Sequence, residues 1–118
     1  MCNFSLPFTG NVDNLVTIAK KAVTGAGGTF NETATPSDPN SRSGNFFVST
    51  SLGHVTGSYT GDLSSGNVTV SASVGHISAS YQTDGVNLTV NISHLPLLVP
   101  CNSVRDQLAA ILGNNTPN

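Results

Sequence analysis

The chain has 118 residues, which is enough for one domain with a single hydrophobic core. Only 8% of its residues are Asp, Glu, Lys or Arg, against about 25% in an average globular protein, and the formal net charge is −2. Four scattered cations cannot form the basic surface that binds nucleic acid or an anionic membrane. No apolar run approaches the roughly 18 residues of a membrane span. The composition therefore excludes nucleic-acid binding and transmembrane helices.

The N-terminal stretch MCNFSLPFTG bears on the cellular location. It lacks both the charged start and the apolar block of a signal peptide, which predicts the cytosol if Met1 is the native first residue. A cytosolic chain normally keeps its cysteines reduced, so we expect Cys2 and Cys101 to be free thiols. A disulfide between them stays open as the alternative.

The first third of the chain predicts a strand, a helix, a second strand and a loop. Residues 3–8 predict a short strand, and Asn11 is a suitable N-cap for the helix that follows. Apolar residues then recur at helical spacing: Leu15, Ile18, Ala19, Ala22 and Val23. Gly25 ends this helix. Residues 29–32 predict a second short strand, and residues 33–44, with two prolines and no periodicity, predict a loop.

Residues 44–60 and 66–82 are two copies of an internal repeat with a period of 22 residues. Nine of the 17 aligned positions are identical. Apolar and polar residues alternate within each copy, which predicts a hairpin of two strands. The expected turns are Leu52-Gly53 in the first copy and Val74-Gly75 in the second.

The alternation continues to the end of this region and predicts an antiparallel meander. Asp84-Gly85 is a strong hairpin signal, and the segment after it partly repeats residues 67–73. The five expected strands are 45–51, 54–60, 67–73, 76–82 and 86–93. With two-residue turns, Val48 faces Gly57 and Val70 faces Ala79 on an apolar face. The opposite face carries Ser, Thr and His, so the repeat widens a one-sided sheet by one hairpin.

The last part of the chain predicts a loop, a helix and a tail. Residues 94–101 form an apolar loop with two prolines. An amphipathic helix follows, with Asn102 or Ser103 as its cap and Gly113 at its end. Residues 114–118 form a flexible tail. The predicted fold is therefore a single α+β domain over residues 1–113, in which a curved antiparallel sheet is covered on one face by an N-terminal and a C-terminal helix.

Several motifs resemble a group of small bacterial proteins with a β-α-β(n)-α order. They are PFTG at 7–10, AGGTF at 26–30, GxFxVxTxLGxVxGSYT at 44–60 and PLLVPC at 96–101. The group is distantly similar to polyhydroxyalkanoic-acid-system proteins, which resemble a reduced helix-grip, START-like scaffold. The resemblance implies packing and turn residues rather than catalytic ones, and an apolar ligand held between sheet and helix. This chain departs from the group by an extra hairpin and by Ser, Thr and His where the group has Lys and Glu.

No residue pattern predicts an enzyme, a cofactor or a metal centre. The serines lack a nucleophile elbow, and Glu32 is the only glutamate, so neither a triad nor a carboxylate pair is indicated. His54 and His76 occupy equivalent positions in the two copies and face the same side. His94 has the parity of the apolar face, so we expect no third metal ligand beside them.

The apolar face supports the main functional hypothesis, which is non-catalytic binding of a small apolar ligand or a hydrophobic surface between sheet and helices. Small residues at its centre, Gly57, Ala72 and Ala79, either leave a cavity or let a helix pack closely. The candidate ligand-binding residues are Phe46, Tyr59, Tyr81, Leu88 and Leu98. In the simpler interpretation these residues only pack beneath the helices.

The hydroxyl-rich face supports an alternative, a structural or self-association module. It is regular and uncharged, which is unusual for a protein surface. The candidate interface residues are Thr56, Ser58, Ser78 and Ser80. Sheets twist, whereas ice or polymer binding needs a flat face, so a homo-oligomer is the favoured use of this surface.

Overall fold

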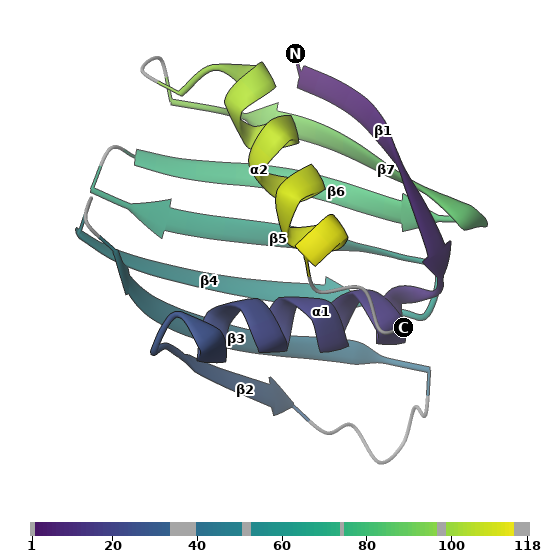
Figure 1. The fold of residues 1–118 in the computed structure, drawn as a ribbon, viewed down its shortest axis with the longest axis horizontal. Helices are drawn as coiled ribbons and strands as arrows, with labels where there is room; N and C mark the ends of the chain where they lie inside the picture. Colours follow the sequence, from purple (N-terminus) through teal and green to yellow (C-terminus); the bar gives the residue numbers. More distant parts are fainter. Residues whose placement is uncertain (1, 34–39, 51–52, 74, 97–98, 115–118) are drawn as a thin grey trace.

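Seven strands form one antiparallel sheet, and two helices lie on one face of it (Figure 1). The computed structural model describes residues 2–33, 40–50, 53–73, 75–96 and 99–114. In chain order the elements are β1 Cys2–Gly10, α1 Val12–Gly25, β2 Thr29–Thr33, β3 Arg42–Thr50, β4 Gly53–Gly61, β5 Ser65–Ala72, β6 Gly75–Thr83, β7 Gly85–His94 and α2 Cys101–Asn114. The strand order is β1-β7-β6-β5-β4-β3-β2. The predicted two-layer α+β fold is confirmed.

The two short strands predicted before the repeat become the edges of the sheet. β1 pairs with β7, and β2 pairs with β3. β3 begins at Arg42, inside the stretch predicted to be a loop, because Ser43 pairs with Thr33 on one side and Thr60 on the other. Partners on both sides therefore extend the strand beyond the part that shows alternation.

The helix α1 begins and ends where the sequence predicts. The side-chain oxygen of Asn11 accepts hydrogen bonds from the backbone N–H groups of Asp13 and Asn14, at 3.0 and 3.4 Å, and Asn14 returns the contact to the N–H of Asn11. Val16 is buried against the sheet although it stands outside the predicted apolar stripe. The helix ends at Gly25.

Both repeat hairpins have a register two residues away from the predicted one. Thr50 pairs with Gly53, and Ala72 pairs with Gly75. The two glycines therefore follow the turn instead of lying in it, and their φ angles of 111° and 132° explain why glycine stands there. Because the shift is an even number of residues, the same side chains still face the helices.

A β-bulge in β7 changes the position of His94. Ala79 pairs with Ile92 but Ser78 pairs with His94, so one extra residue, Ser93, is inserted on the β7 side. The expectation that His94 faces the helices is wrong, because this extra residue reverses the alternation. His94 is exposed on the opposite face, where its ring stacks on that of His76.

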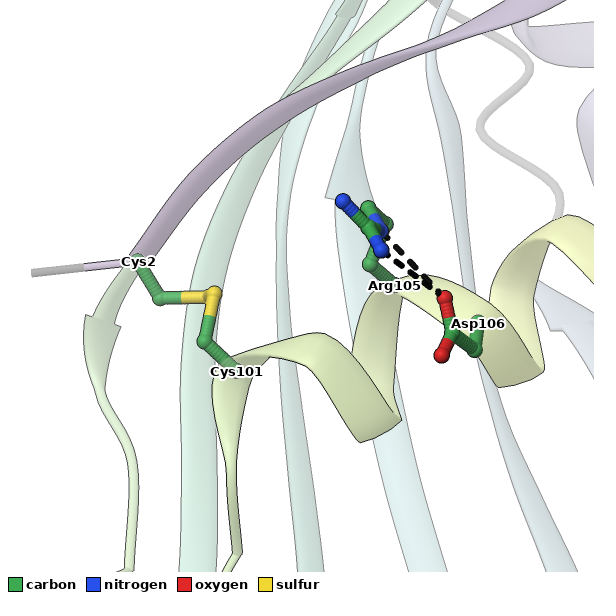
Figure 2. Close-up of a disulfide and its surroundings, with 4 residues drawn as sticks. All are labelled: Cys2, Cys101, Arg105 and Asp106. Carbon is green, nitrogen blue, oxygen red and sulfur yellow. Dashed lines mark hydrogen bonds and ion pairs between the residues drawn. A yellow bond between two sulfur atoms is a disulfide. The ribbon is translucent and has the colours of Figure 1, made fainter.

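A disulfide joins the first strand to the last helix. Cys2 begins β1 and Cys101 begins α2, and Figure 2 shows their side chains meeting across the two elements. The expectation of two reduced cysteines is therefore wrong. The helix begins before the predicted caps because the carbonyl of Pro100 accepts the N–H groups of Ser103 and Val104, at 3.1 and 3.4 Å.

The core lies between the sheet and the two helices, towards the β1 edge. Its buried apolar residues are Cys2, Leu6, Phe8, Val12, Val16, Ile18, Tyr59, Ala79, Tyr81, Leu88, Val90, Ile92 and Leu112. Within the described part of the chain, neither helix is long and apolar enough to cross a membrane. The end of the predicted tail, residues 115–118, lies outside the described residues.

Candidate functional site

The two helices cover only part of the apolar face of the sheet. Seven strands of about nine residues, spaced about 4.8 Å apart with a rise of about 3.3 Å per residue, make a face of roughly 29 by 30 Å. Each helix has 14 residues and covers a strip of roughly 21 by 10 Å. Together they cover about half of the face, so the other half depends on loops or on another molecule for cover.

The covered half contains three of the five predicted ligand-binding residues. Tyr59, Tyr81 and Leu88 have exposed fractions of only 9%, 8% and 1%. They come from β4, β6 and β7, and the alternation that predicts their common face is correct. At this depth the three residues are part of the packed core.

Each tyrosine ring lies over a glycine of the neighbouring strand. Tyr59 pairs with Gly44 and Tyr81 pairs with Gly66. A Cβ atom at Gly44 would lie 2.9 Å from the Tyr59 hydroxyl, and one at Gly66 would lie 2.6 Å from the Tyr81 Cζ atom. The rings fill the space that a side chain would need, which explains why both glycines and both tyrosines recur in the repeat.

The tyrosine hydroxyls are held in a weakly solvated environment. Burial raises the pKa of Tyr59 to about 12, and the nearby negative charge of Glu32 adds to the effect. Burial also raises the pKa of Tyr81, with a smaller contribution from Asp62. The Tyr81 hydroxyl is buried and finds no hydrogen-bond partner among the described residues. An unpaired buried hydroxyl is an available donor for a ligand or a water molecule.

The other half of the apolar face forms what we term the apolar strip. It consists of Phe46, Val48, Val55, Val70, Ala72 and Ile77. All six are half-buried, whereas Gly44 of β3, Tyr59 of β4 and Ala79 and Tyr81 of β6 are buried, so cover on these three strands decreases towards the turn ends of the two repeat hairpins. In Figure 1 these ends of β4, β5 and β6 lie at the left, where the three strands extend beyond α2.

Phe46 lies at the border between the strip and the core. Its ring stacks on Phe30 of β2, with ring centroids 6.0 Å apart, and Phe30 in turn stacks on Tyr59 at 5.7 Å. Gly57 lies beneath the Phe46 ring, because a Cβ atom there would approach two ring carbons to 2.7 Å. The remaining predicted ligand-binding residue, Leu98, lies outside the described residues.

The outer face, which points away from both helices, carries continuous rows of short polar side chains. One row runs Asn31, Asn45, Ser58, Thr69, Ser78 and His94, and the next runs Thr33, Ser43, Thr60, Asn67, Ser80, Asn91 and Asn3. None of these residues is Asp, Glu, Lys or Arg. Neutral side chains of this kind both donate and accept hydrogen bonds without long-range attraction or repulsion.

The predicted interface residues all lie on this outer face. Thr56 and Ser58 are exposed, and Ser78 and Ser80 are half-buried. Ser78 and Ser80 also line a shallow groove of about 450 Å³ between β5, β6, β7 and β1. The alternation alone is therefore sufficient to place these four residues on one surface.

Two ring contacts on the outer face are not expected from the sequence. Phe47 is 41% exposed and stacks on His54 at 5.3 Å, while His76 stacks on His94 at 4.2 Å. The double phenylalanine at 46–47 is the signal for the first contact, since one of two adjacent residues in a strand must face outwards. The second contact depends on the bulge, for which the sequence gives no clear signal.

The structure thus offers two candidate surfaces, the apolar strip on the helix side and the polar outer face. Within the described residues, no group of three or more His, Cys, Asp or Glu side chains is placed to hold a metal ion. The apolar strip is distinguished by incomplete burial, and the outer face by its many neutral hydrogen-bonding side chains. Comparison of the chain with protein-family models, with curated proteins and with solved structures found no match in any of the three.

Proposed function

We propose that the protein is a non-catalytic binding protein that takes up a small apolar molecule, or a hydrophobic surface, at the apolar strip. The observation that carries this proposal is the incomplete cover of six neighbouring apolar residues on one face of the sheet. Contiguous apolar surface that stays accessible is typical of a binding site. The resemblance to helix-grip proteins implies an apolar ligand on this same helix-side face of the sheet.

The size of the strip sets the expected affinity. Burying about 400 Å² of apolar surface, counted over protein and ligand, contributes about 10 kcal/mol. Lost translational and rotational freedom opposes this by at least about 4 kcal/mol. The balance corresponds to a dissociation constant of tens of micromolar.

Native mass spectrometry of the freshly purified protein, followed by solvent extraction, tests for a bound molecule. Because a ligand held at tens of micromolar partly dissociates during purification, we expect a partly occupied species heavier than the bare chain, whose extra mass reappears in the extract as an apolar compound. A bare chain under gentle ionisation would argue against a tightly held ligand.

Neighbouring residues on opposite faces of β5 provide a matched pair of variants. Val70 belongs to the apolar strip, whereas Thr69 is exposed on the outer face. We expect Val70→Asn to weaken binding of anilinonaphthalene sulfonate, an anionic fluorescent dye whose aromatic rings bind apolar surface, several-fold, and Thr69→Asn to leave it unchanged. Equal effects of the two substitutions would contradict the assignment of the site to the strip.

The outer face supports a second candidate function, self-association. The supporting observation is the uncharged rows that cross the sheet beside a shallow groove. Thr56→Lys and Ser78→Lys would each place a charge on this face and should lower the average mass in sedimentation experiments. A wild-type protein that stays monomeric at high concentration would exclude this candidate.

The cellular location is part of the proposal. We propose an oxidising compartment, because a disulfide such as the one between Cys2 and Cys101 rarely persists in the cytosol. Alkylation of free thiols during cell lysis, followed by mass spectrometry, tests this location. An intact disulfide would support it, and two alkylated cysteines would contradict it.

A further inference from the structure

Two histidines from neighbouring strands meet on the outer face of the sheet. His76 lies on β6 and His94 lies on β7, and both side chains are exposed. Their ring centroids are 4.2 Å apart and the ring planes differ by 12°. This contact exists because the bulge at Ser93 turns His94 to the outer face.

We propose that His76 and His94 form a two-histidine site for a divalent transition-metal ion such as Zn²⁺ or Cu²⁺. Neutral imidazole is a preferred ligand of both ions. Zinc–nitrogen bonds of about 2.0–2.1 Å at a tetrahedral angle place the two nitrogens roughly 3.3 Å apart. The ring centroids are 4.2 Å apart, so the two imidazoles are close enough for one ion to reach both, although stacked rings direct their lone pairs in parallel. Binding therefore requires the rings to splay, and exposed side chains rotate on a picosecond-to-nanosecond timescale.

The surroundings of the pair determine what kind of site it is. Ser71 lies opposite His76 and Ser78 lies opposite His94, so the nearest neighbours across the ladder are hydroxyls. The Ser93 hydroxyl donates to the Ser78 carbonyl at 3.2 Å. The row that contains His94, and the row of Thr29, Phe47, Thr56, Ser71 and His76, hold no carboxylate to strengthen the site and no Lys or Arg to repel a cation. Water would fill the remaining positions, which makes the site accessible and exchangeable instead of structural.

The internal repeat supplies a matched control. His54 occupies the position in the first copy that His76 occupies in the second. Its neighbours are different: its ring stacks on Phe47, and its Nδ1 atom lies 3.0 Å from the Ser49 hydroxyl. Neither neighbour supplies a second imidazole. His54 and His76 therefore share a backbone setting, but only His76 has a second imidazole beside it.

Zinc titration of the untagged, disulfide-bonded protein by calorimetry and NMR, at about pH 7.5 where an ordinary imidazole is neutral, tests the proposal. We expect Zn²⁺ to shift the ring signals of His76 and His94 and to leave those of His54 in place. Losing one of two linked ligands should weaken binding by about 100-fold, so His76→Ala and His94→Ala should each nearly abolish it. His54→Ala should change the affinity less than about twofold.

Three results would overturn the proposal. They are no Zn²⁺ binding by the wild type at millimolar metal, an equal loss of affinity in His54→Ala and His76→Ala, and tighter binding of Mg²⁺, which prefers oxygen ligands, than of Zn²⁺. All three histidines are exposed, so the variants should unfold at the wild-type urea concentration. An unchanged unfolding midpoint confirms that lost binding reflects the missing imidazole.

Discussion

The two copies of the repeat build the same hairpin with different interiors. Both pair a glycine with the tyrosine that covers it, Gly44 with Tyr59 and Gly66 with Tyr81. At the next pair towards the turn the copies differ, since the first places a phenylalanine over a glycine, Phe46 and Gly57. The comparison teaches that backbone register is conserved between the copies while side-chain volume is redistributed.

The second copy divides the same interior volume more evenly. It pairs Val68 with Ala79, at the positions that correspond to Phe46 and Gly57. In the first copy a large side chain, Phe46, covers a glycine. In the second copy a valine and an alanine share the same space. Cores accept such exchanges when total volume is conserved.

The copies also differ in the helix above them. α1 lies along β3 of the first copy, while α2 crosses β7, β6 and β5 over the second (Figure 1). α1 follows β1 after a single residue, whereas α2 is tied to β1 by the disulfide. The second copy therefore depends on a covalent link between distant parts of the chain.

Removing the disulfide should have the largest effect and should separate the two copies. Cys2→Ser with Cys101→Ser opens a link between residues 99 positions apart, which should lower the free energy of unfolding by about 2–5 kcal/mol. Urea unfolding measures the loss. Hydrogen exchange should accelerate more in β5 and β6 than in β3 and β4, because α2 lies over the former.

Reduced wild-type protein is the control for this variant and should behave in the same way. Equal acceleration in all four strands would contradict the link between the disulfide and the cover of the second copy.

Exchanging the interior pair tests whether the two packing solutions are equivalent. Gly57→Ala forces a methyl group against the Phe46 ring and should cost about 1–3 kcal/mol. Phe46→Val with Gly57→Ala reproduces the pair of the second copy and should recover most of this loss. Urea unfolding of both single variants and the double variant gives the coupling energy, which we expect to exceed about 1 kcal/mol.

The control for this series is Gly25→Ala, since a Cβ atom there meets nothing within 4 Å and the glycine has no positive φ angle. Its effect should stay within about 0.5 kcal/mol. Additive effects at Phe46 and Gly57 would show that the pair does not act as a unit.

The two tyrosines should respond differently to loss of the hydroxyl. Tyr81→Phe removes a buried, unpaired hydroxyl and should stabilise the protein by about 1 kcal/mol. A raised folded pKa means that stability is fully present below the unfolded pKa of about 10 and is lost as pH rises towards about 12. Tyr59→Phe should reduce this alkaline loss, which tyrosinate absorbance and urea unfolding both monitor. If both tyrosines ionised with a pKa of about 10, as in an unfolded chain, their burial would be refuted.

The aspartates that follow the two copies should have the smallest effect. Asp62 accepts the N–H groups of Ser64 and Ser65, and Asp84 accepts those of Val86 and Asn87, which lowers the pKa of both carboxyls. A lowered folded pKa gives stability that is present above the unfolded pKa of about 3.9 and is lost as pH falls through the folded value. Asp62→Asn and Asp84→Asn should flatten the acid side of the stability profile by similar amounts. If only one of the two substitutions changed the acid side of the stability profile, the turns after the two copies would not be equivalent.

Residue alternation predicts which side chains face the helices, but it does not predict register. Tyr59, Tyr81 and Leu88 lie on the expected face because their parity survives an even shift. The turn position was predicted incorrectly because a glycine with positive φ fits either within a turn or directly after it. Local sequence cannot distinguish the two.

Contacts that depend on the whole sheet are also beyond the sequence. His94 meets His76 only because β7 bulges beside β6, and a bulge is decided by pairing along the entire strand. The disulfide follows from β1 lying next to β7, near the start of α2, and the sequence separation gives no indication of this arrangement. The apolar strip likewise exists because two helices cover only about half of a seven-stranded face, which depends on how the helices are placed on the sheet.

The strand order has a consequence for how the chain folds. From β2 to β7 every neighbour in the sheet is the next strand in the sequence, whereas the β1–β7 pair joins the two ends of the chain. Local hairpins form faster than contacts between distant segments, because closing a long loop costs more chain entropy. We therefore expect the meander to form first and β1 to dock afterwards, which brings Cys2 to Cys101 late. Pulsed hydrogen-exchange labelling during refolding would detect this order as earlier protection of β3–β6 than of β1.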